Sequence, residues 1–130
     1  MKIKINQLRL PLLAMFLCAL FCAFAPLQAH AMSEEEKIAA LIASVRDTPE
    51  GTQFIRNGKA YNVADAVDHL NFKYSKVKSR IKTAEEFITY VASQSSLSGE
   101  AYQIRYPDGK TITSETFFTE KLRKLKDEKK

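Results

Sequence analysis

A stripe of charged and aromatic residues is predicted on one face of a central helix. Its members recur three and four residues apart between positions 63 and 81, a spacing that makes side chains neighbours on a helix surface. Cations beside a phenylalanine are suited to contact an anionic ligand or a partner protein. A solvated flank, with the phenylalanine tucked under a neighbouring element, would give the same pattern. The stripe consists of Asp65, His69, Phe72, Lys73, Lys76 and Arg80.

A cluster of serines suggests a second kind of chemistry. The run from Ser95 to Ser98 holds three hydroxyls, and His69 could act as their base. Asp65 or Asp68 could orient that base. The chain has no nucleophile-elbow motif, however, and serine-rich turns are common as plain loops. A small hydrolase that uses this loop with His69 is one alternative function, and an enzyme inhibitor that presents the loop is another.

Capping signals predict the helices that would position these residues. Ser-Glu-Glu-Glu at 33–36 and Thr-Ala-Glu-Glu at 83–86 are capping boxes. We expect helices over about 34–46, 63–81 and 84–92, with Asn62 as the cap of the second. A last helix is expected to follow Ser114 as its cap, and the charged residues from Lys126 to Lys130 are expected to fray.

Two turn signals predict short hairpins. Asn57-Gly58 supplies the two positive-φ residues of a type I′ turn, so 52–62 is either a hairpin or an irregular loop held by Phe54 and Tyr61. Pro-Asp-Gly at 107–109 would connect an alternating strand at 101–106 to a second arm at 110–113. The pattern predicts an α+β fold, a small single domain of about four helices with two short β-hairpins, over residues 32–125. It leaves open whether the two hairpins join.

The first 31 residues are typical of an export signal. A basic start precedes an apolar run from Leu10 to Phe24, which Pro11 interrupts, and Ala29-His30-Ala31 supplies small residues at the positions that signal peptidase recognises. The run is shorter than the roughly 20 apolar residues that a membrane-spanning helix needs. We therefore expect export to the periplasm, cleavage after Ala31 and no membrane span in the mature chain.

Removal of this signal changes the charge of the chain. The full sequence has 20 Lys and Arg against 15 Asp and Glu, and the signal contains three basic residues and no acid, so the mature balance is 17 − 15 = +2. The mature chain is thus mildly basic, and its expected export argues further against nucleic acid as a partner.

The signal also removes both cysteines and one of the two histidines, the residues that most often hold zinc. Cys18 and Cys22, both cysteines of the chain, are lost with it, and His69 is the one histidine that stays. Asp65 lies four residues before His69, but two ligands are too few for a tight zinc site. We expect neither a metal nor another cofactor.

Four stretches of the chain resemble a known family. They extend over most of the mature sequence, from about Lys37 to Leu122, in a fixed order and spacing. The family consists of small exported proteins of Gram-negative bacteria and is known only as a domain of unknown function. The resemblance implies a periplasmic location and one compact domain, but no catalytic role. The stretches are 54–58 (FIRNG), 66–70 (AVDHL) with Lys73, 80–88 (RIKTAEEFI) and 92–99 (ASQSSLSG) with Tyr102.

The polar residues of the matching stretches define the candidate site. Arg56, His69 and Lys73 have no evident duty in the fold, so they form either a polar network that fixes the hairpin on the helix or part of a contact surface. Phe72 and Ser96 complete the predicted binding site. We expect a non-enzymatic binding or envelope-accessory protein, a monomer or weak oligomer, whose partner is a periplasmic protein or a small anionic ligand.

Overall fold

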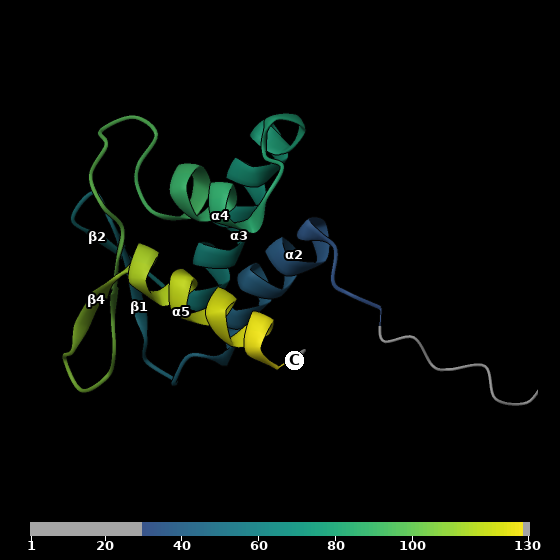
Figure 1. Cartoon of the computed structure of the whole chain (residues 1–130). Coiled ribbons are helices and arrows are strands. Elements are labelled where there is room, and N and C mark those ends of the chain that lie inside the picture. The colour runs from purple at the N-terminus through teal and green to yellow at the C-terminus, as the bar shows by residue number, and fades with distance from the viewer. Residues whose placement is uncertain (1–29, 129–130) are drawn as a thin grey trace, which may run out of the picture. The chain divides into compact units, whose positions relative to one another are not determined.

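A four-stranded antiparallel sheet lies along one side of the helices (Figure 1). The computed structural model describes residues 30–128, so the predicted export signal lies outside the described residues except for its last two positions. The strands are β1 (Gln53–Arg56), β2 (Lys59–Tyr61), β3 (Gln103–Arg105) and β4 (Thr111–Thr113). The helices are α2 (Glu34–Ser44), α3 (Val63–Val77), α4 (Ala84–Phe87) and α5 (Ser114–Asp127).

The two hairpins join into a single sheet in the order β2-β1-β3-β4. Phe54 pairs with Tyr61 in the first hairpin and with Ile104 of β3 on its other side. Asn57 and Gly58 have φ values of 49° and 75°, which a type I′ turn requires. The hairpin interpretation of 52–62 and the predicted α+β class are therefore confirmed.

Three of the four predicted helix caps are confirmed, and the fourth is wrong by one residue. Both capping boxes are formed, and Asn62 accepts from the backbone N–H of Asp65 at 2.8 Å. Helix α5 is capped by Thr113, which accepts from the N–H of Thr116 at 3.2 Å. Ser114 is instead buried and donates to the carbonyl of Ala92 at 2.8 Å. Serine and threonine hydroxyls can both cap a helix. Because the hydroxyl of Ser114 is already bonded to Ala92, Thr113 is the residue that caps α5.

Three helices end differently from expectation. Helices α2 and α3 finish in short 3₁₀ turns, Val45–Asp47 and Lys78–Arg80, so each regular α-helix is shorter than its apolar period suggests. Such tightened last turns are common at helix ends. Helix α5 extends through Asp127, and Lys126 forms an ion pair with Glu85, so this part of the expected frayed tail is helical. Residues 129–130 lie beyond the described part of the chain.

The segment after α4 is a π-helix, η3 (Ile88–Ala92). Its wider turn accommodates one extra residue, and the hydroxyl of Ser93 donates to the carbonyl of Ile88 at 2.5 Å. Val91 and Ala92 are buried, whereas Tyr90 is exposed. The π-helix thus keeps the core face and turns a tyrosine outward.

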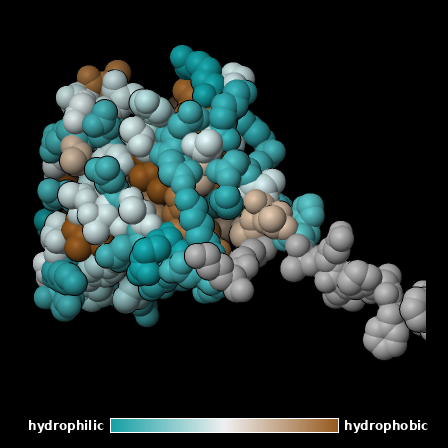
Figure 2. Space-filling model, viewed as in Figure 1, coloured by the Kyte–Doolittle hydropathy of each residue, from teal (hydrophilic) through white to brown (hydrophobic). Residues whose placement is uncertain are grey.

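The hydrophobic core lies between the helices and the inner face of the sheet. Its ring contacts are edge-on: Phe87 lies 5.6 Å from Tyr74 and 6.2 Å from Phe118 between ring centroids. Every described core residue belongs to the unit Ala31–Lys130. Figure 2 shows hydrophilic and near-neutral residues over most of the face in view, with hydrophobic residues visible at its centre and in smaller patches near its edges. None of the helices in the described range is long and apolar enough to cross a membrane.

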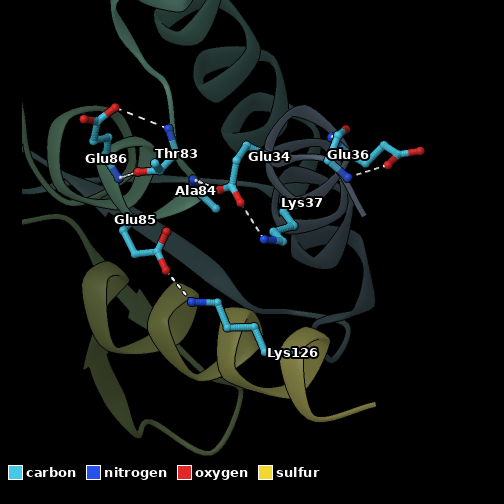
Figure 3. A network of polar contacts seen from close by, with 9 residues as sticks. Glu34, Glu36, Lys37, Thr83, Ala84, Glu85, Glu86 and Lys126 are labelled. Atoms are coloured by element: carbon cyan, nitrogen blue, oxygen red, sulfur yellow. Dashed lines mark hydrogen bonds and ion pairs between the residues drawn. The ribbon is translucent and has the colours of Figure 1, made fainter. Parts of the chain in front are cut away.

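A carboxylate joins the first helix to the start of α4 (Figure 3). Glu34 accepts from the backbone N–H of Ala84 at 2.8 Å and from Lys37 at 2.5 Å. Together with the Thr83–Glu86 capping box, this contact satisfies N–H groups that a helix start leaves without partners. These hydrogen bonds lower the pKa of Glu34 below its usual value, with the bond from Lys37 as the largest cause.

We predict that Glu34→Ala lowers the free energy of unfolding by about 1 kcal/mol, because the N–H of Ala84 loses its acceptor. Since the folded-state pKa of Glu34 is lowered, its contribution is present above the unfolded pKa and is lost as the pH falls through the folded pKa. Urea unfolding of both proteins at neutral and acidic pH measures this. Glu35→Ala is the control, because Glu35 pairs only with the exposed Lys78 among the described contacts and should matter little. Equal losses in the two variants would contradict the prediction.

Candidate functional site

A groove of about 590 Å³ opens beside the first hairpin and α3. Its other walls are the π-helix η3 and residues 95–100, which we call the serine loop. All five residues of the predicted site line this groove, which we call the basic groove. Their role in binding stays a prediction. They are Arg56, His69, Phe72, Lys73 and Ser96.

A chain of hydrogen bonds runs along the floor of the basic groove. The guanidinium of Arg56 donates to Nδ1 of His69, and Nε2 of His69 lies 3.2 Å from the hydroxyl of Tyr102. Lys73 donates to the same hydroxyl at 3.2 Å and to the carbonyl of Gln94 at 2.8 Å. Arginine has no acceptor, so Nδ1 must be the unprotonated nitrogen and Nε2–H must donate to Tyr102. The tyrosine oxygen therefore accepts two bonds and keeps its own proton to donate.

The surroundings of this chain fix its charges. Burial, followed by the charges of Arg56 and Lys73, lowers the pKa of His69 to about 4. Burial and the Arg56 charge lower the pKa of Lys73 to about 8. Burial raises the pKa of Tyr102, so it stays a phenol at neutral pH. At pH 7 the floor consequently holds two cations, a neutral imidazole and a neutral hydroxyl.

The cations of the basic groove lack acidic partners in the described structure. Arg56 lies over the ring of Tyr61 at 4.4 Å, and Lys73 lies 4.9 Å from the ring of Tyr102, but neither forms an ion pair with a described residue. Lys59 and Lys76 also line the groove, and none of its described lining residues is acidic. Positive charge therefore accumulates here without a neutralising carboxylate.

The serine loop is held by a buried hydroxyl. Ser95 is 5% exposed, and its Oγ accepts from Asn57 Nδ2 at 3.4 Å and from the N–H groups of Leu97 and Ser98 at 3.3 Å. Ser98 in turn donates to Oδ1 of Asn57 at 2.7 Å. These bonds fasten the loop to the turn of the first hairpin, and Ser96 is left exposed at the groove.

Exposed apolar side chains surround the basic groove. Phe72 is 60% exposed, with the ammonium of Lys76 5.0 Å from its ring, so it is not tucked under a neighbouring element. Tyr90 and Leu97 are 67% and 99% exposed and line the same groove. The alternative of a solvated flank that covers Phe72 is thus wrong.

Sequence reasoning missed two contributors to the site. Tyr102 was expected on the alternating strand at 101–106 and was not included in the predicted binding site, but its hydroxyl joins His69 to Lys73. Its place in one of the matching stretches was the available signal. For Leu97, the available signal in the sequence was a large apolar residue among serines. Of the helix stripe, Asp65 lines a smaller neighbouring cavity with His69 rather than the groove itself.

The contacts of His69 bear on the hydrolase alternative. Both ring nitrogens face other groups, Arg56 and Tyr102, and no described serine hydroxyl contacts the ring. The hydroxyls of Ser95 and Ser98 are engaged with Asn57. The serine–histidine contact that this alternative requires is therefore absent from the described residues. Among the described residues, no group of three or more histidine, cysteine or acidic side chains is placed to hold a metal.

Comparison with known proteins gives a family match without an activity. Residues 32–126 match the model of DUF5329, a family of unknown function. The chain is 42% identical over 80 residues to an uncharacterized protein, YfeK, of Salmonella typhimurium. This match covers 62% of the chain and 63%, less than two thirds, of the relative. No solved structure matches the chain.

We predict that Arg56→Gln raises the pKa of His69 part of the way from about 4 toward 6.5. Burial, the largest cause of the lowered pKa, remains, but the stronger of the two charge repulsions is removed. NMR titration of the ring protons measures this, with Lys59→Gln as a control that keeps the charges of Arg56 and Lys73.

The lowered pKa of His69 also makes the stability of the wild type depend on pH. As the pH falls, the unfolded chain binds a proton at this histidine before the folded chain does, since the pKa of an unperturbed histidine is near 6.5. Stability should therefore fall by roughly 1 kcal/mol as the pH drops from 6.5 to 4, after allowance for solvent screening. An unchanged histidine pKa in Arg56→Gln would contradict the prediction.

Proposed function

Because the chain belongs to DUF5329, a family of unknown function, we propose its role from its own geometry: an exported, non-enzymatic protein that binds an anionic group in the basic groove. The observation that carries this proposal is the meeting of Arg56 and Lys73 at one neutral hydrogen-bonded chain without an acidic partner among the described residues.

Two partly buried cations without a counter-ion favour an incoming anion. Burial weakens the competition of water, so a carboxylate or phosphate between them forms stronger charge-assisted hydrogen bonds than it would at an open surface. The proton that Tyr102 keeps can be donated to the same anion. His69 supports the site as a neutral spacer: it joins Arg56 to Tyr102 and adds no charge of its own.

The arrangement supports binding rather than hydrolysis. A general base must reach the proton that it removes, and the lone pair of His69 accepts from Arg56, which never gives up its charge. An inhibitor is a second candidate, because the serine loop is held by several hydrogen bonds and presents Leu97 fully to solvent. An inhibitor loop of this kind would, however, leave the basic groove without a role.

Export to the periplasm is the second part of the proposal. It is supported by the basic start, the apolar run and the small residues at 29–31. The family match also begins at Met32, directly after the proposed cleavage site.

We predict that the protein recovered from the periplasmic fraction of a Gram-negative host begins at Met32, because the small side chains of Ala29 and Ala31 fit signal peptidase. N-terminal sequencing and intact mass check this. Replacing Ala31 with Arg is the control and should leave the unprocessed chain in the membrane fraction. Recovery of an intact Met1 chain from the cytosol would contradict export.

We predict that inorganic phosphate shifts the ring resonances of His69 and Tyr102 in a saturable way. Lys73→Gln should weaken this binding by about tenfold or more, because it removes a charge-assisted hydrogen bond. Binding should also weaken as the pH rises through about 8, where Lys73 loses its proton. NMR titration gives both results.

Lys124→Gln is the matched control for phosphate binding, since it removes one charge from the exposed side of α5. Equal weakening in the two variants would show general charge attraction instead of a site. Absence of saturable shifts in the wild type at neutral pH would overturn the proposed anion site.

A further inference from the structure

The exposed apolar side chains of the molecule gather at one place. In the described range, three large hydrophobic residues are exposed, Phe72, Tyr90 and Leu97, and all three line the basic groove. They come from α3, the π-helix η3 and the serine loop, which are separate segments of the chain. Single exposed apolar residues are ordinary on a protein surface, whereas a cluster on one face marks an interaction site.

The most exposed of them is held in place by its own loop. The N–H of Leu97 donates to the buried Oγ of Ser95, and the loop is closed by hydrogen bonds from Ser95 N–H to the Glu100 carbonyl and from Gly99 N–H to the Ser95 carbonyl, both 2.9 Å. A loop with this many internal bonds keeps its tip in one position. Leu97 therefore projects into solvent as a fixed part of the fold, and little ordering entropy is lost when it is buried by a partner.

Charge and apolar surface alternate around the same groove. The ammonium of Lys76 lies 5.0 Å from the ring of Phe72, and that of Lys59 lies 5.3 Å from the ring of Tyr61. Lysines in such positions cover apolar surface with their stems and hold their charges at its edge. The groove thus combines a cationic floor, Arg56 and Lys73, with an apolar rim.

We propose that this face docks on a phospholipid surface that carries anionic headgroups. The proposal rests on the anion site proposed above. A lipid phosphate would enter the groove between Arg56 and Lys73, while Leu97 and the rim aromatic rings would lie at the boundary between headgroups and acyl chains. Basic residues near an anionic membrane surface add attraction of their own.

The arrangement of the rim favours a lipid surface over a protein partner. Phe72, Tyr90 and Leu97 are exposed beside a groove lined by four cations, a combination of apolar and positive surface that an anionic lipid interface attracts. A lipid interface accepts protruding side chains at any point of its plane, and the amphipathic ring of Tyr90 suits that depth.

Vesicle binding tests the proposal with the chain Met32–Lys130, which contains the whole described core. The protein is pelleted with vesicles of phosphatidylcholine alone and with vesicles that also contain phosphatidylglycerol. We expect at least about tenfold tighter binding to the anionic vesicles, since four cations line the groove. Leu97→Ser should weaken this binding by about tenfold, and Leu97→Phe should retain it. Leu97 is fully exposed, so neither change should disturb folding.

Fluorescence gives a second readout, because the chain contains no tryptophan. Leu97→Trp places a single indole at the tip of the serine loop, and its emission should shift to the blue with anionic vesicles only. Thr119→Trp, at an exposed position of α5 outside the groove lining, should show no shift and serves as the control.

The outcomes separate this inference from the proposed function. Absence of preference for anionic vesicles, or an unshifted Leu97→Trp emission, overturns the membrane inference, while saturable phosphate binding would leave the anion site standing. Binding of an acidic, phenylalanine-containing peptide without vesicle binding would assign the same face to a protein partner. Loss of both phosphate and vesicle binding would overturn both proposals.

Discussion

The pairing of β1 with β3 is the contact on which the rest of the structure depends. Phe54 and Ile104 are register partners, and Ile104 is fully buried. Without this pairing each hairpin would be a two-stranded ribbon, which is marginal in water. With it, Arg56 at the end of β1 and Tyr102 just before β3 are brought to the two sides of His69. The groove is thus a consequence of how two short hairpins stabilise each other.

The polar chain on the groove floor joins separate segments of the fold and holds two cations along one line of hydrogen bonds. Arg56 belongs to the hairpin, His69 and Lys73 to α3, and Tyr102 to the segment that enters β3, so their bonds join three parts of the domain. Part of the stabilisation from these bonds is offset by the burial of Lys73 and by the nearby charge of Arg56, which together lower the pKa of Lys73. Perturbed titratable groups are frequent at functional sites, although structural networks perturb them too. Arg56, His69 and Lys73 form a polar network with Tyr102, and their role as a contact surface stays a prediction.

Local signals in the sequence predicted local structure well. The capping boxes, the cap at Asn62 and the Asn57-Gly58 turn depend on residues three or fewer positions apart, and each is present. The joining of the hairpins could not be predicted, because strands of three or four residues carry too little pattern to specify a distant partner. The same limit applies to Ser114, whose buried bond to Ala92 spans 22 positions and displaced it from its expected role as a cap. The residues of the candidate site were found by their types and by the matching stretches. Tyr102 lies in one of these stretches, but nothing in the sequence indicated that its hydroxyl connects His69 to Lys73.

The π-helix η3 has a consequence for how this surface can vary. A π-turn amounts to a one-residue insertion in an α-helix, and such insertions leave the flanking core in place while they change what faces outward. Within η3, Ile88 and Val91 are buried, whereas Tyr90 is exposed. Deletion of Tyr90 alone would shorten this segment by one residue and take away a side chain that lines the groove. The outer surface of this domain can therefore be altered by a change of length without any exchange of core residues.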